Sequence, residues 1–182
     1  MKIKKEELYS NLDRTIGFIN SCDSKVSIYL ATLGVLITVF LSEDNIKTIN
    51  SIFNGIKNNF STFSKGYSIV VILSLISLII GVALLVSVLV PRTKIDSYDS
   101  ELIKDDSIIF FDKISNKKYK DFSRIIDNVT DDEIIEDIKS QIFINSKICS
   151  KKFKLQRYGL LIASLAVVLI LILYIIGIHV YM

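Results

Sequence analysis

The sequence has few of the residues that metal sites and covalent active sites require. Two cysteines and one histidine in 182 residues are too few for a tetrahedral zinc site within one chain. The seven glycines are scattered singly, and no P-loop, G-x-G-x-x-G, H-E-x-x-H or G-x-S-x-G motif is present. Because neither a paired nucleophile and base nor a metal cluster is evident, we predict that the protein is not an enzyme and needs no cofactor.

Charge is missing from three long stretches of the chain. Residues 26–42, 66–91 and 158–182 contain no Asp, Glu, Lys or Arg over 17, 26 and 25 positions. A bilayer core about 30 Å thick requires about 20 such residues in a helix, and 17 is near the lower limit. The sequence therefore predicts an all-α membrane protein with three transmembrane helices and a cytoplasmic helical cap between the second and the third.

The orientation follows from the distribution of Lys and Arg. Five precede Val26, three lie in 43–65, fourteen lie in 92–157 and none follows Arg157. The positive-inside rule then predicts a cytoplasmic N-terminus and an external C-terminus in the cell (inner) membrane. The predicted organisation is a cytoplasmic N-terminal helix (1–25), two transmembrane helices (26–90) with an external loop (43–65), a cytoplasmic helical region (91–157) and a third transmembrane helix (158–182).

Apolar periodicity predicts two helices much longer than a membrane span. The first covers residues 3–41, with an apolar stripe at Leu8, Leu12, Ile16, Ile19 and Val26. The last starts at a capping box between Thr130 and Glu133 and continues to Met182 without a Pro or Gly that would stop it in its polar half. Shorter helices are predicted at 49–56, 99–103 and 117–126, and Pro91 marks the end of the second span.

Each span carries small residues four positions apart, which allow helices to approach closely. The pairs are Ser27 with Ala31, Ser77 with Gly81, and Gly159 with Ala163. This spacing supports packing within one chain as readily as assembly of several chains.

One face of the last helix changes from apolar to polar as it nears the membrane. The apolar residues Ile134, Ile135, Ile138 and Ile142 are followed on this face by Asn145, Cys149, Lys152 and Gln156. Lys147, Lys151, Lys154 and Arg157 lie around it, with Arg92 and Lys94 at the neighbouring helix end. Two interpretations stay open: these are flanking cations on anionic lipid, or they enclose a small anion such as a nucleotide phosphate.

Two further groups admit a structural and a functional interpretation. Asp23 and Lys25 lie where the first helix enters the membrane, and they point about 200° apart on it, so we expect no pairing between them. Lys25 can reach the headgroups and Asp23 can lie at a helix interface, or either can serve a site. Phe110 and Phe111 are expected in the core of the cap rather than in ligand stacking.

Three stretches together resemble the transmembrane effector domain of Pycsar, a bacterial anti-phage system built on pyrimidine cyclases. They are FINSCDSKVSI at 18–28, SIIFFDKIS at 107–115 and QIFINSKICSKKFKL at 141–155. The resemblance implies a partner cyclase that makes cyclic CMP or cyclic UMP on infection. It also implies a membrane effector that senses this nucleotide and disrupts the membrane. The infected cell then dies before phage matures, an outcome called abortive infection.

The physical argument then selects ligand-binding candidates. Lys and Arg side chains can pair the phosphate, amides or Asp23 can contact the base edge, and an aromatic ring can stack on the base. The candidates are Asp23, Lys25, Phe111, Tyr119, Gln141, Asn145, Lys147, Lys151, Lys152 and Arg157. Expected partners are the lipid bilayer, the pyrimidine nucleotide cyclase and further copies of the chain, and no nucleic acid polymer is expected. The alternatives are a ligand-independent holin-like toxin and an accessory subunit of a larger membrane complex. An adjacent cyclase gene would favour the nucleotide-sensing effector over both alternatives.

Overall fold

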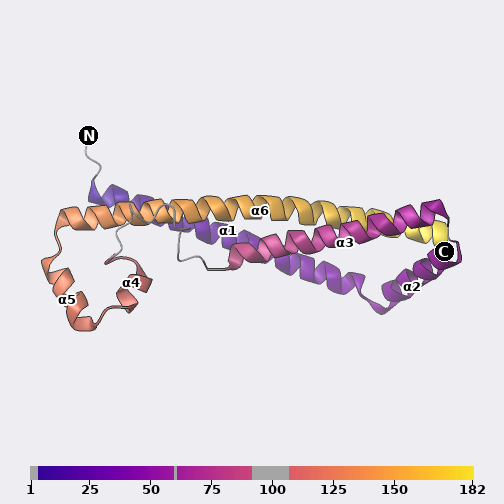
Figure 1. Ribbon diagram of the computed structural model, residues 1–182, viewed down its shortest axis with the longest axis horizontal. Helices are drawn as coiled ribbons and strands as arrows, with labels where there is room; N and C mark the ends of the chain where they lie inside the picture. The colour runs from indigo at the N-terminus through magenta and orange to yellow at the C-terminus, as the bar shows by residue number, and fades with distance from the viewer. Residues whose placement is uncertain (1–3, 60, 92–106) are drawn as a thin grey trace. The chain divides into compact units, whose positions relative to one another are not determined.

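The computed structural model describes residues 4–59, 61–91 and 107–182, and every regular element in these ranges is an α-helix (Figure 1). The helices are α1 (Lys5–Phe40), α2 (Glu43–Asn58), α3 (Thr62–Leu89), α4 (Phe111–Ser115), α5 (Tyr119–Asn128) and α6 (Asp131–Tyr181). The predicted all-α class is confirmed. The helix expected at 99–103 lies outside the described residues, as do Arg92 and Lys94.

Three of these helices are long and apolar enough to cross a membrane, namely α1, α3 and α6. The 28 residues of α3 extend over about 42 Å at 1.5 Å per residue, which exceeds a hydrocarbon core of about 30 Å. The prediction of three spans is confirmed, and the protein is a multi-pass membrane protein.

The chain folds as two compact units, and α1 and α6 each contribute a segment to both. The cap unit comprises Met1–Cys22 and Pro91–Phe153. The membrane unit comprises Asp23–Val90 and Lys154–Met182, and it contains the three charge-free stretches except for Pro91.

In the cap unit, the first part of α1 buries one stripe of side chains. Leu8, Leu12, Thr15 and Cys22 are buried, and Ile19 is half-buried. These five positions follow one another at alternating steps of four and three residues. The prediction that Ile16 belongs to this stripe is wrong, because its side chain is 39% exposed. Two successive steps of four advance about 80° beyond two full turns, so the position three residues after Leu12 faces the core instead.

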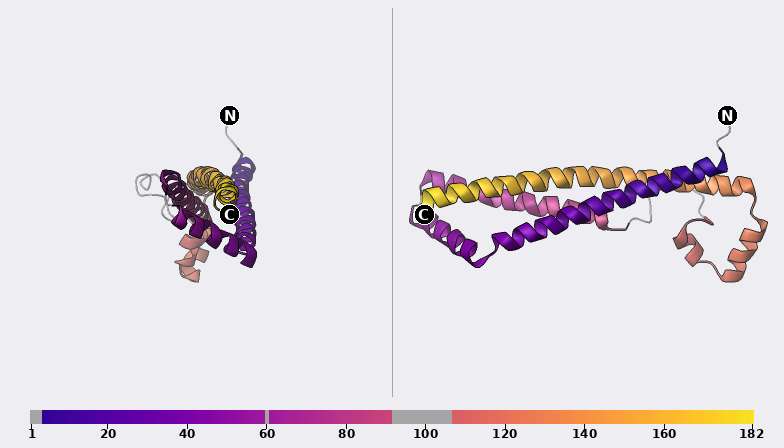
Figure 2. Two further views of the ribbon diagram at one scale, coloured as in Figure 1. Left: turned by 90° about the vertical axis from the view of Figure 1, so that its right-hand side faces the viewer. Right: turned by 180° about the vertical axis from the view of Figure 1, so that it is seen from behind.

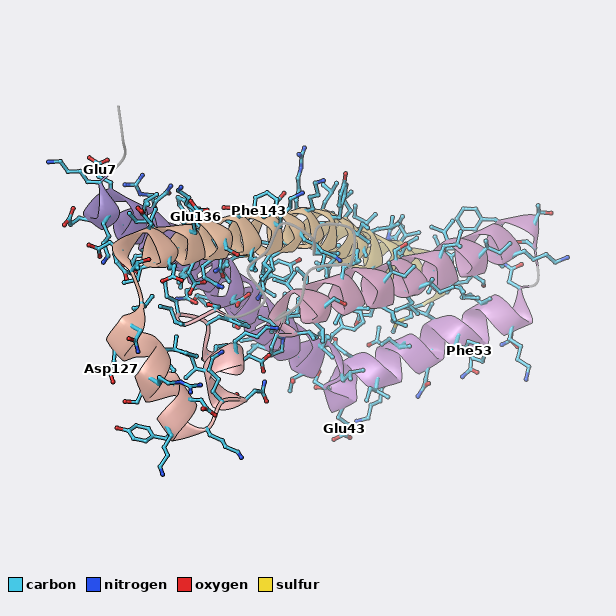
Figure 3. All side chains as sticks on the ribbon, turned by 60° about the vertical axis from the view of Figure 1, so that its left-hand side comes forward. Glu7, Glu43, Phe53, Asp127, Glu136 and Phe143 are labelled. Carbon is cyan, nitrogen blue, oxygen red and sulfur yellow. The ribbon has the colours of Figure 1, made fainter. Side chains whose placement is uncertain are left out.

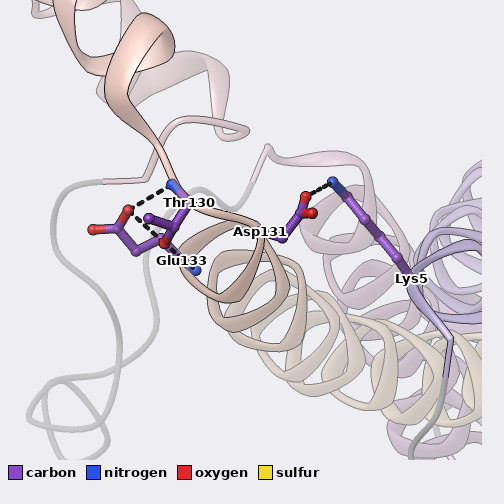
Figure 4. Close-up of polar contacts among 4 residues, drawn as sticks. All are labelled: Lys5, Thr130, Asp131 and Glu133. Atoms are coloured by element: carbon purple, nitrogen blue, oxygen red, sulfur yellow. Dashed lines mark hydrogen bonds and ion pairs between the residues drawn. The ribbon is translucent and has the colours of Figure 1, made fainter.

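The start of α6 has the capping box that the sequence predicts (Figure 4). The Thr130 amide donates to the Glu133 carboxylate at 2.8 Å, and the Glu133 amide donates to the Thr130 hydroxyl at 3.3 Å. The next residue, Asp131, accepts a hydrogen bond from the Lys5 ammonium at 2.8 Å. This bond raises the pKa of Lys5 and lowers the pKa of Asp131. Both groups are solvated, so the pair contributes little to stability.

In the membrane unit, α3 and α6 run side by side at two glycines (Figure 2). A Cβ atom at Gly81 would lie 2.7 Å from the Ala163 amide nitrogen, and one at Gly159 would lie 2.8 Å from Cγ of Leu85. Two of the small-residue pairs therefore supply a contact within the chain. The third pair, Ser27 with Ala31, is exposed.

The segment between the first two spans differs from the expected solvated loop with a short helix at 49–56. It forms the 16-residue helix α2, whose Ile52 is buried. Glycines again permit the contact: a Cβ at Gly55 would meet the Tyr181 carbonyl at 2.7 Å, and one at Gly177 would meet Ile52 at 3.0 Å. The charged side of α2, which includes Glu43, faces outward (Figure 3).

The remaining elements of the cap unit are α4 and α5. The predicted helix at 117–126 corresponds to α5, and the apolar run after Ser107 leads into α4. The prediction that both Phe110 and Phe111 fill the core is wrong for Phe111, which is 66% exposed. Adjacent residues at the start of a helix point in different directions, so only Phe110 is half-buried.

Candidate ligand-sensing site

A buried carboxylate organises the cap unit where α6 meets the segment before α4. Asp137 has no exposed surface. Its Oδ2 atom accepts hydrogen bonds from the Ser107 hydroxyl at 3.0 Å, the Ile108 amide at 2.8 Å and the Ile109 amide at 3.2 Å. Three donors on one carboxylate oxygen compensate for part of the cost of burying the group.

Ser107 completes this arrangement, and it is only 1% exposed. Its hydroxyl oxygen accepts from the Phe110 amide at 2.9 Å, from the Ile109 amide at 3.2 Å and from the Gln141 side chain at 3.3 Å. Residues 107–110 are thereby held against α6 as a tight turn. We refer to Ser107, Asp137 and Gln141 as the Asp137 clasp.

One buried polar atom of the clasp and one on a neighbouring residue of α6 have no hydrogen-bond partner in the part of the chain that the structure describes. They are Oδ1 of Asp137 and Oγ of Ser140, three residues further along α6. Unsatisfied buried acceptors are rare in proteins because each costs about 1–3 kcal/mol. Oδ1 of Asp137 and Oγ of Ser140 could therefore each accept a hydrogen bond from an additional donor.

The polar face predicted for α6 is turned inward within the cap unit. Gln141 is buried, Asn145 and Cys149 are half-buried, and Lys152 is only 4% exposed. The Asn145 amide donates to the Gln141 carbonyl at 2.8 Å, which is a bond within the helix. Burial raises the pKa of the Cys149 thiol, so this residue is a neutral thiol near neutral pH.

The other cap-unit candidates are exposed. Lys147 and Lys151 face solvent on α6, and the Lys147 ammonium lies 5.2 Å from the ring centroid of Phe143. Phe111 and Tyr119 expose 66% and 82% of their surface. These four side chains do not depend on core packing for their position, unlike the buried candidate Lys152.

Three candidates belong to the membrane unit. Asp23 is half-buried, and Lys25 and Arg157 are exposed. Within that unit, Val26 and Gln156 are buried, and they are adjacent in sequence to Lys25 and Arg157.

Ser107 and Asp137 were not among the predicted site residues, although the sequence contains a signal for Asp137. It lies four residues before Gln141 and three after Ile134, so it falls on the predicted inward face. An ionisable residue on such a face requires buried partners. Ser107 had no comparable signal, because its role depends on a contact with a residue 30 positions away.

These features define an all-α, multi-pass membrane protein with a separate helical unit built around a buried carboxylate. The chain matches the Pycsar effector protein domain over residues 7–178. It is 33% identical to the Pycsar effector protein GmPycTM of Gulbenkiania mobilis, in an alignment that covers 92% of this chain and 90% of that protein. The chain therefore belongs to the Pycsar effector family, whose members are membrane effectors of anti-phage defence. No solved structure matches it significantly.

Proposed function

We propose that this protein senses a cyclic pyrimidine nucleotide, cyclic CMP or cyclic UMP, made by a partner cyclase, and then disrupts the cell membrane. Death of the infected cell before phage matures is the resulting abortive infection. The observation that carries the proposal is family membership over residues 7–178, because this range covers nearly all of the three spans and of the cap unit. The name of the relative, a Pycsar effector protein, supports a role in the same kind of defence module.

The cap unit has groups suited to each part of such a ligand. Lys147 and Lys151 are exposed cations for the single phosphate charge. Phe111 and Tyr119 are exposed rings on which a base can stack. The amide of Asn145, on the inward face of α6, is of the type that contacts a base edge.

Activation requires a difference in affinity between two states of the protein. A ligand shifts the equilibrium only if it binds the disrupting state more tightly than the resting state. The Asp137 clasp is the element of the cap unit that such a ligand would act on, because a donor on the ligand would satisfy the acceptors that remain open there.

The direct test is calorimetric titration of the purified full-length protein with cyclic CMP, cyclic UMP, cyclic AMP and cyclic GMP. We expect binding of one of the two pyrimidine nucleotides and much weaker binding of both purine nucleotides. In cells, killing should require co-expression of the cyclase. Killing at equal expression without any cyclase, together with no binding in the titration, would contradict the proposal and favour a ligand-independent holin-like toxin.

The site can be tested with the Lys151→Gln variant against Lys139→Gln as its matched control. Both lysines are exposed on α6, and Lys139 lies twelve residues nearer the start of the helix, where it pairs with Glu136 at 2.6 Å. Loss of one charge-assisted bond of about 1.5–3 kcal/mol weakens binding about ten- to a hundredfold, so only Lys151→Gln should lose affinity. Lys152→Gln is a poorer test because a change at this buried position also alters stability.

The aromatic candidates Phe111 and Tyr119 have a separate test. Because both rings are exposed, their removal can change ligand binding without changing the stability of the fold. Phe111→Ala and Tyr119→Ala should leave the melting temperature nearly unchanged. If one ring stacks on the base, its variant loses about 1–3 kcal/mol of binding free energy. Phe18→Ala, at an aromatic residue of α1 that is 53% exposed, is the control. Unchanged affinity in both variants and in Lys151→Gln would place the binding site elsewhere.

A further inference from the structure

The membrane unit contains a cavity of about 710 Å³ between α1, α2, α3 and α6. Its wall consists mainly of leucine, isoleucine and valine side chains, among them Leu36, Ile49, Leu75 and Leu171. The volume lies within the range of about 300–1,000 Å³ that is typical of ligand sites. The cavity belongs to no part of the candidate sensing site.

The polar side chains on this wall are already engaged by the protein. The Tyr67 hydroxyl donates to a backbone carbonyl of α6 at 2.8 Å, and the Tyr174 hydroxyl donates to Asn45 at 2.9 Å. The hydroxyls of Ser68 and Ser74 donate to carbonyls of the preceding turn of α3. The wall therefore favours hydrocarbon over a polar ligand such as a nucleotide.

The cavity is open to the surroundings of the helices. Its lining residues Leu36, Ile72 and Leu75 keep 50%, 56% and 47% of their surface exposed. For membrane-spanning helices these surroundings are lipid chains, not water. An apolar cavity does not hold water well, and an empty one loses the dispersion contacts of its wall.

Helix α2 indicates how a lipid would lie. Its apolar residues Ile49, Ile52 and Ile56 line the cavity, while Lys47 and Glu43 form an exposed ion pair at 2.7 Å. An amphipathic helix of this kind lies in the membrane interface, at the level of the lipid headgroups. A chain that extends from this level into the hydrocarbon region would enter the cavity.

We propose that this cavity holds one acyl chain of a membrane phospholipid, with the headgroup at the level of α2. A helix from a second copy fits less well, because a cylinder about 10 Å wide would fill this volume with about 9 Å of its length, less than two turns. A single acyl chain is narrower and can follow the length of the wall. The bound lipid stabilises the contacts between α2 and the spans by mass action.

Two adjacent residues of α3 provide a matched test. Leu75 and Ile76 are each 47% exposed, and of the two only Leu75 lines the cavity. Native mass spectrometry of the delipidated protein, titrated with dioleoyl phosphatidylglycerol, should show one tightly bound lipid per chain in the wild type and in Ile76→Trp. Leu75→Trp narrows the cavity and should weaken this binding about tenfold, which corresponds to about 1.4 kcal/mol.

A second variant tests the proposal by a spectroscopic measurement. The chain has no tryptophan, so Phe40→Trp introduces a unique fluorophore at a residue that lines the cavity. In vesicles of phosphatidylcholine with brominated chains, its fluorescence should be quenched to an extent comparable with that of lipid-facing Ile76→Trp. Far weaker quenching of Phe40→Trp, or equal lipid binding by Leu75→Trp and Ile76→Trp, would overturn the proposal. A change of oligomeric state in Leu75→Trp, with lipid binding unchanged, would instead assign the cavity to a second copy.

Discussion

A few buried polar residues form the polar interior of the cap unit, and among them Asp137 requires the most hydrogen bonds because its side chain is a carboxylate. Its carboxylate is fully buried and accepts three hydrogen bonds from the turn at residues 107–110. Because these donors come from a distant segment, the carboxylate determines where the chain enters α4. A substitution at Asp137 therefore acts on the whole turn.

Asp137→Ala should destabilise the cap unit by about 3 kcal/mol, because it removes the acceptor of the Ile108 amide and the Ser107 hydroxyl and one of the two acceptors of the Ile109 amide. Asp137→Asn keeps an acceptor oxygen and should recover part of this loss. Thermal unfolding measures the effect, and faster hydrogen exchange at the two amides locates it. Glu136→Ala is the matched control, since Glu136 is the preceding, exposed residue of α6 (Figure 3). Equal melting temperatures for Asp137→Ala and Glu136→Ala would show that the clasp does not stabilise the protein.

Cys149 supplies a prediction of pH dependence. Burial raises its pKa above the ordinary value of 9.0, so the folded protein favours the neutral thiol. The resulting contribution to stability is present below pH 9.0 and is lost as the pH rises through the folded-state pKa. Alkylation requires the thiolate, so its rate at Cys149 should still be rising at a pH where an exposed thiol has reached its plateau.

The experiment compares two proteins that both carry Cys22→Ala, so that each has a single cysteine. The first keeps Cys149, and the second, the exposed control, carries Cys149→Ala and Ser150→Cys. Ser150 lies one residue further along α6 and faces solvent. Iodoacetamide rates are measured by mass spectrometry between pH 7 and roughly 10.5, around the ordinary thiol pKa. Faster alkylation of Cys149 than of the exposed control at pH 8 would contradict the prediction.

At the scale of elements, close contacts at glycines determine how the helices of the membrane unit pack. Gly81 and Gly159 bring α3 and α6 together, and Gly55 and Gly177 bring α2 onto α6. Small residues at helix interfaces are the usual means of association in membranes, where apolar burial gives no advantage over lipid. The packing of α3 on α6 should therefore be sensitive to a single methyl group.

Gly81→Ala should destabilise the membrane unit by about 1–3 kcal/mol, because the added Cβ would lie 2.7 Å from the backbone of Ala163. Gly66→Ala is the matched control on the same helix, since a Cβ there has no neighbour within 4 Å. The control should be neutral or stabilising by up to about 1 kcal/mol, because alanine is the better helix former. Melting in detergent compares them, and an equal response of both variants would refute a tight contact at Gly81.

At the scale of the whole molecule, an odd number of spans predicts that the start of α1 and the end of α6 lie on opposite sides of the membrane. The distribution of Lys and Arg, with fourteen in 92–157 and none after Arg157, predicts which side is which. This orientation predicts a cytoplasmic cap unit, on the side of the membrane where we propose that a cyclase makes the nucleotide.

Reporter fusions test this orientation in cells. A phosphatase reporter after Met182 should be active, as expected on the external side, and the same reporter near Lys118 should be inactive. A reporter that is active only in the cytoplasm should show the opposite pattern at both positions. A cytoplasmic C-terminus would contradict the predicted orientation.

The sequence by itself determined the elements of this protein that depend on local patterns. Charge-free runs predict spans because a charge in hydrocarbon is costly, and α1, α3 and α6 confirm the three that were expected. The capping box at Thr130 and Glu133 is equally local, since both partners lie within one helical turn. The inward face of α6 through Ile138 and Lys152 follows from the helical period alone.

Only the tertiary structure decided which polar groups meet across the chain and which apolar side chains remain exposed. The Asp137 clasp joins segments about 30 residues apart, and helix periodicity does not encode such a pairing. The exposure of Phe111 and the packing of α2 on α6 likewise depend on neighbouring elements. The acyl-chain cavity is the clearest case, because its wall combines residues of four helices and its volume depends on how those helices diverge.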